Sequence, residues 1–166
     1  MEVKNYILNY YKGQQTSSMF LLIWSIGTGI GAVSLLFAGD DIFLEAIAYP
    51  GLAFALLQIV HATQSIWRAK QRLRIIQTTI SDSIPARFLK NERSYIMQAA
   101  AQAKLRASAQ LFLIFFGAGL LALGIYGFSS VVLVGSGLAT LLQNAIAYVY
   151  NNISYWRLQL FAAEIS

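Results

Sequence analysis

Long apolar runs without a charged residue are the main pattern along this chain of 166 residues. The runs cover residues 13–39, 46–67 and 107–156. A helix needs about 20 apolar residues to cross the roughly 30 Å hydrocarbon core of a bilayer. A Lys or Arg at the bilayer centre costs about 2.5–3.5 kcal/mol. The first two runs are therefore predicted to hold one membrane span each, and the third run is long enough for two.

The pattern predicts an all-α integral membrane protein with four transmembrane helices. The predicted spans are residues 18–38, 42–66, 108–128 and 131–150, and the last two are separated at Gly127-Phe128-Ser129-Ser130. A transmembrane β-barrel is excluded because its strands alternate between apolar and polar residues, whereas these runs are continuously apolar.

The composition supports this class and limits the available chemistry. The chain is 57% hydrophobic and 11% charged, whereas about 25% of the residues of a soluble domain are charged. The apolar excess excludes a disordered chain. The chain has no Cys and one His, which excludes a disulfide scaffold and makes a Cys- or His-rich metal centre implausible. We therefore expect no metal and no other cofactor.

The basic residues predict the orientation. Two of the twelve Lys and Arg residues precede the first span, nine lie between the second and third spans, and one follows the fourth. Asp40, Asp41 and Glu45 cluster on the opposite side. The positive-inside rule places both termini and the central segment in the cytoplasm. The small size and short outer loops favour a bacterial inner (cytoplasmic) membrane.

The central segment, residues 67–107, is predicted to form a cytoplasmic helical hairpin that extends the second and third spans. Strong helix formers fill residues 67–76, Pro85 suits the first turn of a new helix, and apolar residues then recur at helical spacing to residue 107. An Ala-rich face permits close packing, and the basic face is solvated or contacts anionic lipid headgroups. The residues singled out in this hairpin are Arg68, Arg72, Arg74, Arg93, Ala99, Ala100 and Ala103.

The two ends, residues 1–16 and 151–166, each have an apolar helical face. Tyr6, Ile7, Tyr10 and Tyr11 share the first face, whereas the second face contains Ile153, Trp156 and Leu160. Aromatic residues beside a membrane favour the headgroup layer. Interfacial anchoring of both ends is therefore expected.

The two halves of the sequence resemble each other weakly. The similar pairs occur in the same order and are residues 20–27 with 112–119, 51–58 with 137–143, and 65–68 with 154–157. An internal repeat would place a pseudo-twofold axis along the membrane normal. Duplication is one hypothesis, and chance similarity between apolar segments is the other.

Small residues recur four positions apart in every span. These pairs are Gly27 and Gly31, Gly51 and Ala55, Ala118 and Ala122, and Gly135 and Ala139. Helices in lipid associate through close van der Waals contact, which small residues permit. The pairs are therefore candidates for packing within one bundle or against a second protomer.

A polar face is predicted on the second and fourth spans. Its candidate residues are Gln58, His61, Gln64, Gln143, Asn144 and Asn151. Because unpaired polar groups are costly in hydrocarbon, these residues are expected to face the bundle interior or water near the cytoplasmic side. The functional hypothesis is a polar vestibule around His61, and the structural alternative is hydrogen bonding between helices.

Glu45 and Pro50 mark the outer end of the second span. A carboxylate in a membrane segment is a candidate for proton or cation coupling, although Glu45 is shallow enough to reach water. Pro50 lacks a main-chain donor, so it is expected to kink the helix and to free a carbonyl near Ala46.

No catalytic motif is present, so we expect a protein that is not an enzyme. The favoured hypothesis is a membrane-embedded binding or regulatory subunit that acts through lateral helix packing and the basic hairpin. Its size and topology, but no motif, resemble those of small bacterial four-span proteins that neutralise pore-forming toxins. The alternative is a homo-oligomeric small channel or transporter that uses the polar face. The expected partners are the lipid bilayer and another membrane protein or a second copy; no nucleic acid is expected, because topology and lipid contact explain the basic segment.

Overall fold

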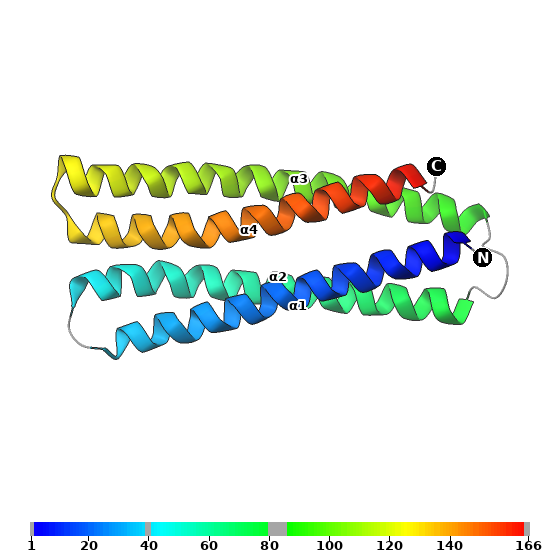
Figure 1. The fold of residues 1–166 in the computed structure, drawn as a ribbon, viewed down its shortest axis with the longest axis horizontal. Helices are drawn as coiled ribbons and strands as arrows, with labels where there is room; N and C mark the ends of the chain where they lie inside the picture. The colour runs from blue at the N-terminus through cyan, green and yellow to red at the C-terminus, as the bar shows by residue number, and fades with distance from the viewer. Residues whose placement is uncertain (1, 39–40, 80–85, 165–166) are drawn as a thin grey trace.

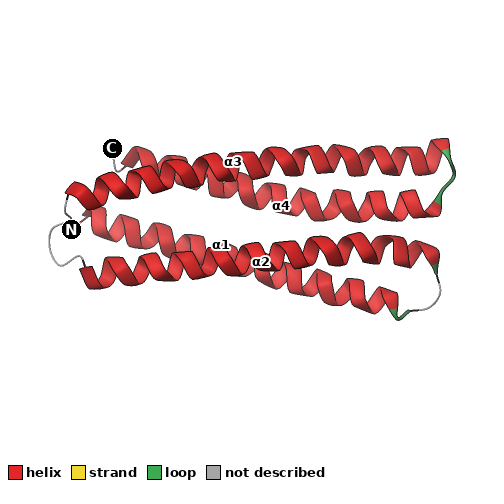
Figure 2. Ribbon diagram, turned by 180° about the vertical axis from the view of Figure 1, so that it is seen from behind, coloured by secondary structure: helices red, strands yellow, loops and turns green. Residues whose placement is uncertain are grey.

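The computed structural model describes residues 2–38, 41–79 and 86–164, and nearly all of them are helical. The elements are α1 (Glu2–Leu36), α2 (Ile42–Thr79), α3 (Ala86–Ala122), a π-helical turn η1 (Leu123–Gly127) and α4 (Val131–Glu164), as Figures 1 and 2 show. Asp40 and the predicted break at residues 81–85 lie outside the described residues.

Each predicted span lies largely within one of the helices. By length and composition, all four helices could cross a membrane. The prediction of four apolar helices is therefore confirmed. The division of the third run is also confirmed, since α3 continues through η1 to Gly127 and α4 begins at Val131. Ser129 in the intervening turn has a φ of 47°.

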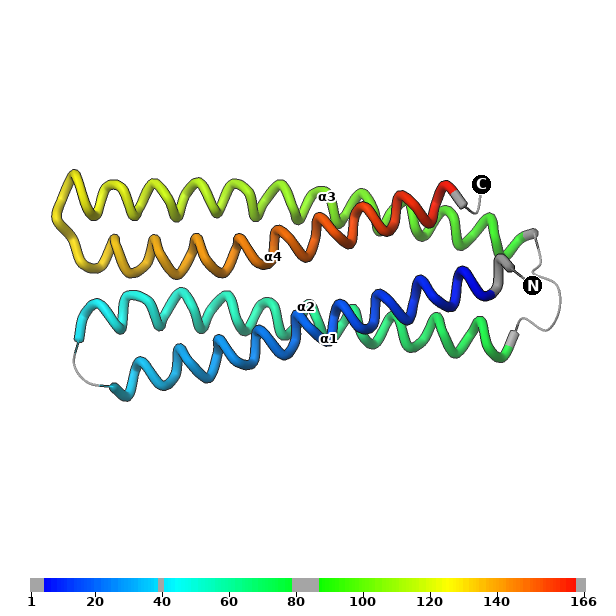
Figure 3. The backbone as a smooth tube through the Cα atoms, viewed as in Figure 1, coloured from blue at the N-terminus to red at the C-terminus, as the bar shows by residue number. Residues whose placement is uncertain are grey.

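The helices form two antiparallel hairpins, α1–α2 and α3–α4, that lie side by side. Figure 3 shows the order α3, α4, α2, α1 in the left half of the view, and toward the right α3 and α4 cross each other, as do α1 and α2. The hairpins meet mainly through α2 and α4, while the Cα atoms of α2 and α3 stay more than 8 Å apart throughout the described ranges. This order suits two repeated hairpins, although duplication itself stays a prediction.

Both chain ends and the adjoining ends of α2 and α3 lie together at one end of the bundle (Figure 1). We call this part the basic end; it comprises residues 5–17, 67–78, 87–107 and 151–163. The opposite end, which we call the short-turn end, contains residues 37–38, 41 and 128–130. The long helices have 34 to 38 residues, or about 51–57 Å at 1.5 Å per residue. They are thus about 21–27 Å longer than a hydrocarbon core requires.

A hydrophobic core fills the basic end and draws on all four helices. Its buried members are Ile7, Tyr11, Ala69, Ile76, Ile96, Ala100, Ala103, Leu158 and Phe161. The ring of Phe161 stacks on Tyr10 at a centroid distance of 4.3 Å and on Tyr6 at 5.6 Å. The basic end is therefore a four-helix bundle with an interior of its own.

This core uses one face of each chain end, and interfacial anchoring of the two ends stays a prediction. Residues 5–16 and 151–163 continue α1 and α4 without a break, and Ile7 and Phe161 pack against protein. Their burial removes apolar area from water. The expected apolar face of the C-terminal end, with Trp156 and Leu160, is exposed, and the buried face is the one with Leu158 and Phe161.

The central segment also differs from a two-helix hairpin. The main chains of its arms, in α2 and α3, stay more than 8 Å apart between Cα atoms, because the ends of α1 and α4 pack with them into the same core. The arms still meet through side chains such as Arg72 and Glu92. Ala100 and Ala103 are buried in that core, and Ala99 is half-buried beside it. The Ala-rich face is thus already occupied within the chain.

Close helix contacts occur at glycines, but in part at other positions than predicted. A Cβ on Gly137 would lie 2.6 Å from the main-chain nitrogen of Leu121, and one on Gly117 would lie 2.8 Å from that of Leu141. The α3–α4 contact therefore uses Gly117 and Leu121, one position before the predicted Ala118 and Ala122. The side chain of Ala118 is half-buried and that of Ala122 is exposed, because they lie beside this contact.

The remaining predicted small residues divide into two groups. Gly51, Ala55, Gly135 and Ala139 are buried between helices, and a Cβ on Gly135 would lie 2.8 Å from that of Ala46 in α2. Gly27 and Gly31 behave differently: a Cβ at either position would meet nothing within 4 Å among the described atoms.

Candidate functional site

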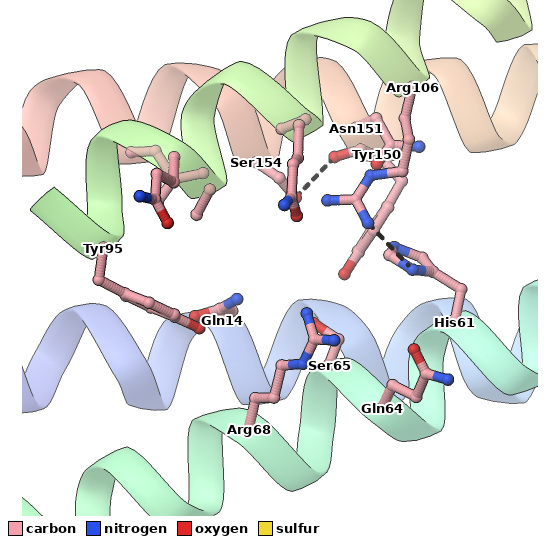
Figure 4. A pocket seen from close by; sticks show the side chains of 15 residues that line it. Gln14, His61, Gln64, Ser65, Arg68, Tyr95, Arg106, Tyr150, Asn151 and Ser154 are labelled. Carbon is pink, nitrogen blue, oxygen red and sulfur yellow. Dashed lines mark hydrogen bonds between the residues drawn. The ribbon is translucent and has the colours of Figure 1, made fainter.

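A polar cavity of about 130 Å³ lies between the two hairpins, where the apolar segments meet the basic end (Figure 4). All four helices contribute to its wall. The lining residues are Gln14, His61, Gln64, Ser65, Arg68, Tyr95, Gln98, Ala99, Gln102, Ala103, Arg106, Tyr150, Asn151, Ser154 and Leu158. The wall thus contains many hydrogen-bond donors, two guanidinium groups and no carboxylate.

Arg106 and His61 form the closest polar contact across this cavity. Arg106 Nη1 lies 3.4 Å from His61 Nδ1 and connects α3 to α2. The imidazole ring also meets the ring of Tyr150 edge to face at 6.1 Å between centroids. Figure 4 shows the guanidinium groups of Arg106 and Arg68 extending from opposite walls into the same space.

Neither arginine of the cavity has a carboxylate partner within the described ranges. The ion pair found there joins Arg72 to Glu92. The Nε atom of Arg106 is buried and has no hydrogen-bond partner in the same ranges. No carboxylate of the described residues therefore neutralises the positive charge in this cavity.

A second cavity of about 260 Å³ lies against the first and extends between the apolar segments. The two share His61, Arg106 and Asn151. Its other lining residues are Leu21, Phe54, Leu57, Gln58, Gln110, Leu113, Asn144 and Ala147. The polar cavity thus adjoins a space with a mostly hydrocarbon wall.

The predicted polar face of α2 and α4 points into the space between the hairpins. Gln58 accepts a hydrogen bond from Ser25 at 3.2 Å and donates one to the Gln143 carbonyl at 3.3 Å. Asn151 donates to Gln110 at 2.8 Å. These bonds join α1 to α2, α2 to α4, and α4 to α3. Gln58 and Asn151 therefore take part in hydrogen bonding between helices and also line the cavities.

The other predicted polar residues occupy different surroundings. Gln64 is exposed at the rim of the polar cavity, and Asn144 is buried and donates to the Thr140 carbonyl of its own helix at 2.8 Å. The side-chain oxygen Oε1 of Gln143 is buried and has no partner among the described residues. Gln143 faces a groove of about 300 Å³ that also contains Gly31.

Glu45 lies away from this site. It is half-exposed in the first turn of α2 at the short-turn end. Sixteen residues separate it from His61, or about 24 Å of helix. Asp41, just before it, accepts a hydrogen bond from the Phe43 amide at 2.8 Å and caps the helix. The structure therefore does not bring Glu45 to the polar residues near His61.

A buried carboxylate network at the basic end was not predicted from the sequence. Glu92 is 1% exposed; it accepts a hydrogen bond from the Tyr11 hydroxyl and pairs with Arg72 at 3.2 Å. Two causes raise the pKa of Tyr11: burial is the larger, and the nearby negative charge of Glu92 is the second. The Tyr11 hydroxyl therefore stays protonated. The Arg72 guanidinium also lies 4.2 Å from the centre of the Tyr95 ring, which forms part of the cavity wall.

The remaining basic residues singled out from the sequence lie on the surface. Arg74 and Arg93 are exposed at the basic end, and Arg68 is exposed where it borders the cavity. Arg106 and Gln110 are two polar residues of the cavities that sequence reasoning missed. Their spacing of four residues at the start of the third apolar run was a usable signal, because it places both on one helical face.

The polar side chains that line the polar cavity are amide, hydroxyl, imidazole and guanidinium groups, which can bind a ligand through hydrogen bonds. No cluster of three or more His, Cys, Asp or Glu side chains that could hold a metal occurs in the searched, described part of the chain. The cavity wall offers hydrogen bonds and positive charge. Comparison of the chain with protein-family models, with curated proteins and with solved structures gives no match.

Proposed function

We propose that this protein is a membrane-embedded, non-enzymatic binding or regulatory subunit that packs laterally against a helix of another membrane protein. In this proposal both termini and the basic end lie in the cytoplasm, and the membrane is a bacterial inner membrane. The distribution of the basic residues supports this orientation. Arg68, which is exposed two residues beyond the predicted second span, then lies beside anionic headgroups, whereas Arg74 and Arg93 extend further into the cytoplasm.

The observation that carries the proposal is a pair of glycines in α1 that no neighbouring helix covers among the described residues. Gly27 and Gly31 lie one turn apart in an apolar helix, and a Cβ at either would contact nothing. Phe20 and Ile23, which also lie on the outer part of α1, are each 68% exposed. Such a surface lets another helix approach its main chain closely.

A buried polar group next to this surface adds a second argument. The groove that contains Gly31 also contains Trp24, Leu142 and Gln143, and Gln143 Oε1 is buried without a partner in the described residues. A small rotation of the Gln143 side chain would present this oxygen to a hydrogen-bond donor on an incoming helix. Hydrogen bonds between membrane helices contribute about 0.6–2 kcal/mol each.

The test is cross-linking in native membranes, followed by recovery of the tagged protein and quantitative mass spectrometry. Three proteins are compared: wild type, Gly31→Leu, and Gly119→Leu as the matched control. Gly119 is also open, since a Cβ there meets nothing within 4 Å, but it has no small residue four positions away. A foreign membrane protein recovered at stoichiometric yield with wild type and Gly119→Leu, and lost with Gly31→Leu, supports the proposal.

Two other results contradict it. Self-cross-links alone, at one discrete size, would favour the homo-oligomeric channel or transporter. Equal recovery of the same protein with wild type and Gly31→Leu would show that the α1 surface is not the binding surface.

The channel alternative has its own test in liposomes. It requires His61→Ala or Glu45→Gln to change ion flux without changing oligomer size. In the described residues Gln58 and Asn151 hydrogen-bond within one chain, an arrangement that favours the binding proposal. Robust wild-type flux that both variants leave intact would remove His61 and Glu45 from any transport path.

A further inference from the structure

We propose that the polar cavity between the hairpins binds the phosphate group of an anionic ligand, with Arg106 and Arg68 as its main contacts. The chemistry is that of a phosphate oxyanion, and a phospholipid headgroup is the source that the surroundings favour. This site is separate from the Gly27 and Gly31 surface, so it does not depend on the proposed binding function.

The first argument is charge. Arg106 enters the cavity from α3 and Arg68 from α2, and none of the described residues that line the wall is a carboxylate. Arg68 keeps contact with water at the rim of the cavity, whereas Arg106 is half-buried. A half-buried guanidinium without an anionic partner is unfavourable. Planar guanidinium groups also match the oxygens of a phosphate in pairs.

The second argument is the unused donor of Arg106. Its Nη1 atom contacts His61, whereas its Nε atom is buried and has no partner among the described residues. Buried donors without partners are uncommon in folded proteins and call for a ligand or an ordered water. A small rotation of the Arg106 side chain would present this donor to an oxyanion in the cavity.

The third argument is space and its lining. A volume of about 130 Å³ equals roughly four water molecules at about 30 Å³ each, which leaves room for a small oxyanion group. Gln102, Ser154 and the Tyr150 hydroxyl are further polar groups of the wall. The adjoining cavity of about 260 Å³ is lined by Leu57, Leu113 and other apolar side chains. A ligand with a phosphate head and a hydrocarbon chain fits this pair of cavities best.

The test compares lipid and phosphate binding to the full-length protein in a neutral detergent. Native mass spectrometry measures retention of phosphatidylglycerol and of phosphatidylcholine with the same acyl chains, and phosphorus NMR measures binding of inorganic phosphate. The variants are Arg106→Gln and Arg68→Gln. Lys104→Gln is the matched control, because Lys104 is an exposed cation of the same helix outside the cavity lining.

The expected result is selective retention of phosphatidylglycerol by wild type and Lys104→Gln, weakened about tenfold or more in each arginine variant, since each loses a charge-assisted hydrogen bond. Binding of inorganic phosphate with the same dependence on both arginines, but no preference among lipids, also supports the phosphate site and assigns it a soluble ligand. Circular dichroism of each variant checks that the helices are retained, and Arg68→Gln serves if Arg106→Gln does not fold.

Equal binding by wild type and both arginine variants would overturn the site. An equal loss in Lys104→Gln would also overturn it, because the effect would then reflect net charge and not the cavity.

Discussion

The Ser136 hydroxyl donates a hydrogen bond of 3.2 Å to the main-chain carbonyl of Ala46. That carbonyl is the one that Pro50 leaves without a donor, since proline has no N–H to offer to the residue four positions earlier. The sequence predicted that Pro50 leaves a carbonyl near Ala46 without its main-chain donor. The structure shows that the Ser136 hydroxyl donates to this carbonyl instead. The defect in α2 thus becomes a link between the two hairpins.

This relationship predicts coupling between Ser136 and Pro50. Ser136→Ala should destabilise the protein by about 0.6–1.7 kcal/mol, because the Ala46 carbonyl loses its donor. In a Pro50→Ala background the main-chain N–H at position 50 takes over that carbonyl, so Ser136→Ala should cost much less. Thermal unfolding of the four proteins in detergent, followed by circular dichroism, gives the coupling. Equal costs in both backgrounds would show that the serine acts independently of the proline.

Glu92 is expected to be the most sensitive charged residue of the basic end. Glu92→Ala leaves Tyr11 and Arg72 without their buried partner, a loss of about 3–5 kcal/mol in comparable sites. Because the Arg72 side chain is 31% exposed and can regain water, we expect about 3 kcal/mol, or roughly 6–12 °C in Tm. The neighbouring Arg93→Ala, at an exposed position, should change stability by less than about 0.5 kcal/mol. Similar melting curves for both variants would contradict the buried network.

The α3–α4 contact predicts opposite effects for two glycines. Gly137→Ala places a methyl group 2.6 Å from the main-chain nitrogen of Leu121, so the helices must separate, and we expect a cost of about 1–3 kcal/mol. Gly119→Ala meets open space and should stabilise the helix by up to about 1 kcal/mol through its better helix propensity. Unfolding midpoints in one detergent compare the two. A neutral Gly137→Ala would place the α3–α4 contact elsewhere.

The absence of cysteine allows the α1–α2 alignment to be tested by disulfide formation. A Cβ on Gly51 would lie 3.7 Å from the Cβ of Ala32, within the range of about 3.5–4.5 Å that a disulfide requires. The pair Ala32→Cys and Gly51→Cys should therefore cross-link within the chain on oxidation, which blocks labelling by a maleimide reagent. A Gly27→Cys and Gly51→Cys pair is the control, because Gly27 faces open space. Efficient oxidation of the control alone would require a different face of α1 to contact α2.

The gaps between charged residues were sufficient to predict four apolar helices and the turn near Ser129. These features depend on local composition, because hydrocarbon length and the cost of burying a charge act on each segment by itself. The positions of the polar residues were also informative. Gln58 and Asn151 do face the interior, since leaving them against hydrocarbon would cost more than pairing them.

The partners of each helix could not be derived in the same way. Gly117 and Ala118 are adjacent small residues, and only the position of α4 decides that Gly117 makes the close contact. Arg106 was counted among the residues that orient the chain, and its inward direction depends on where α2 places His61. The sequence of one helix shows which residues share a face. Which of two similar faces contacts a neighbouring helix depends on the packing of all four helices.

The core of the basic end also has a consequence for biosynthesis. Leu158 and Phe161 belong to this core, and Leu158 also lines the polar cavity. Both residues are synthesised after the four apolar segments, because chains are made from the N-terminus. A nascent chain that ends before residue 158 already contains all four apolar segments, whereas its core lacks Leu158 and Phe161 and its cavity lacks one lining side chain. Completion of the basic end therefore waits for the last turns of α4 to leave the ribosome.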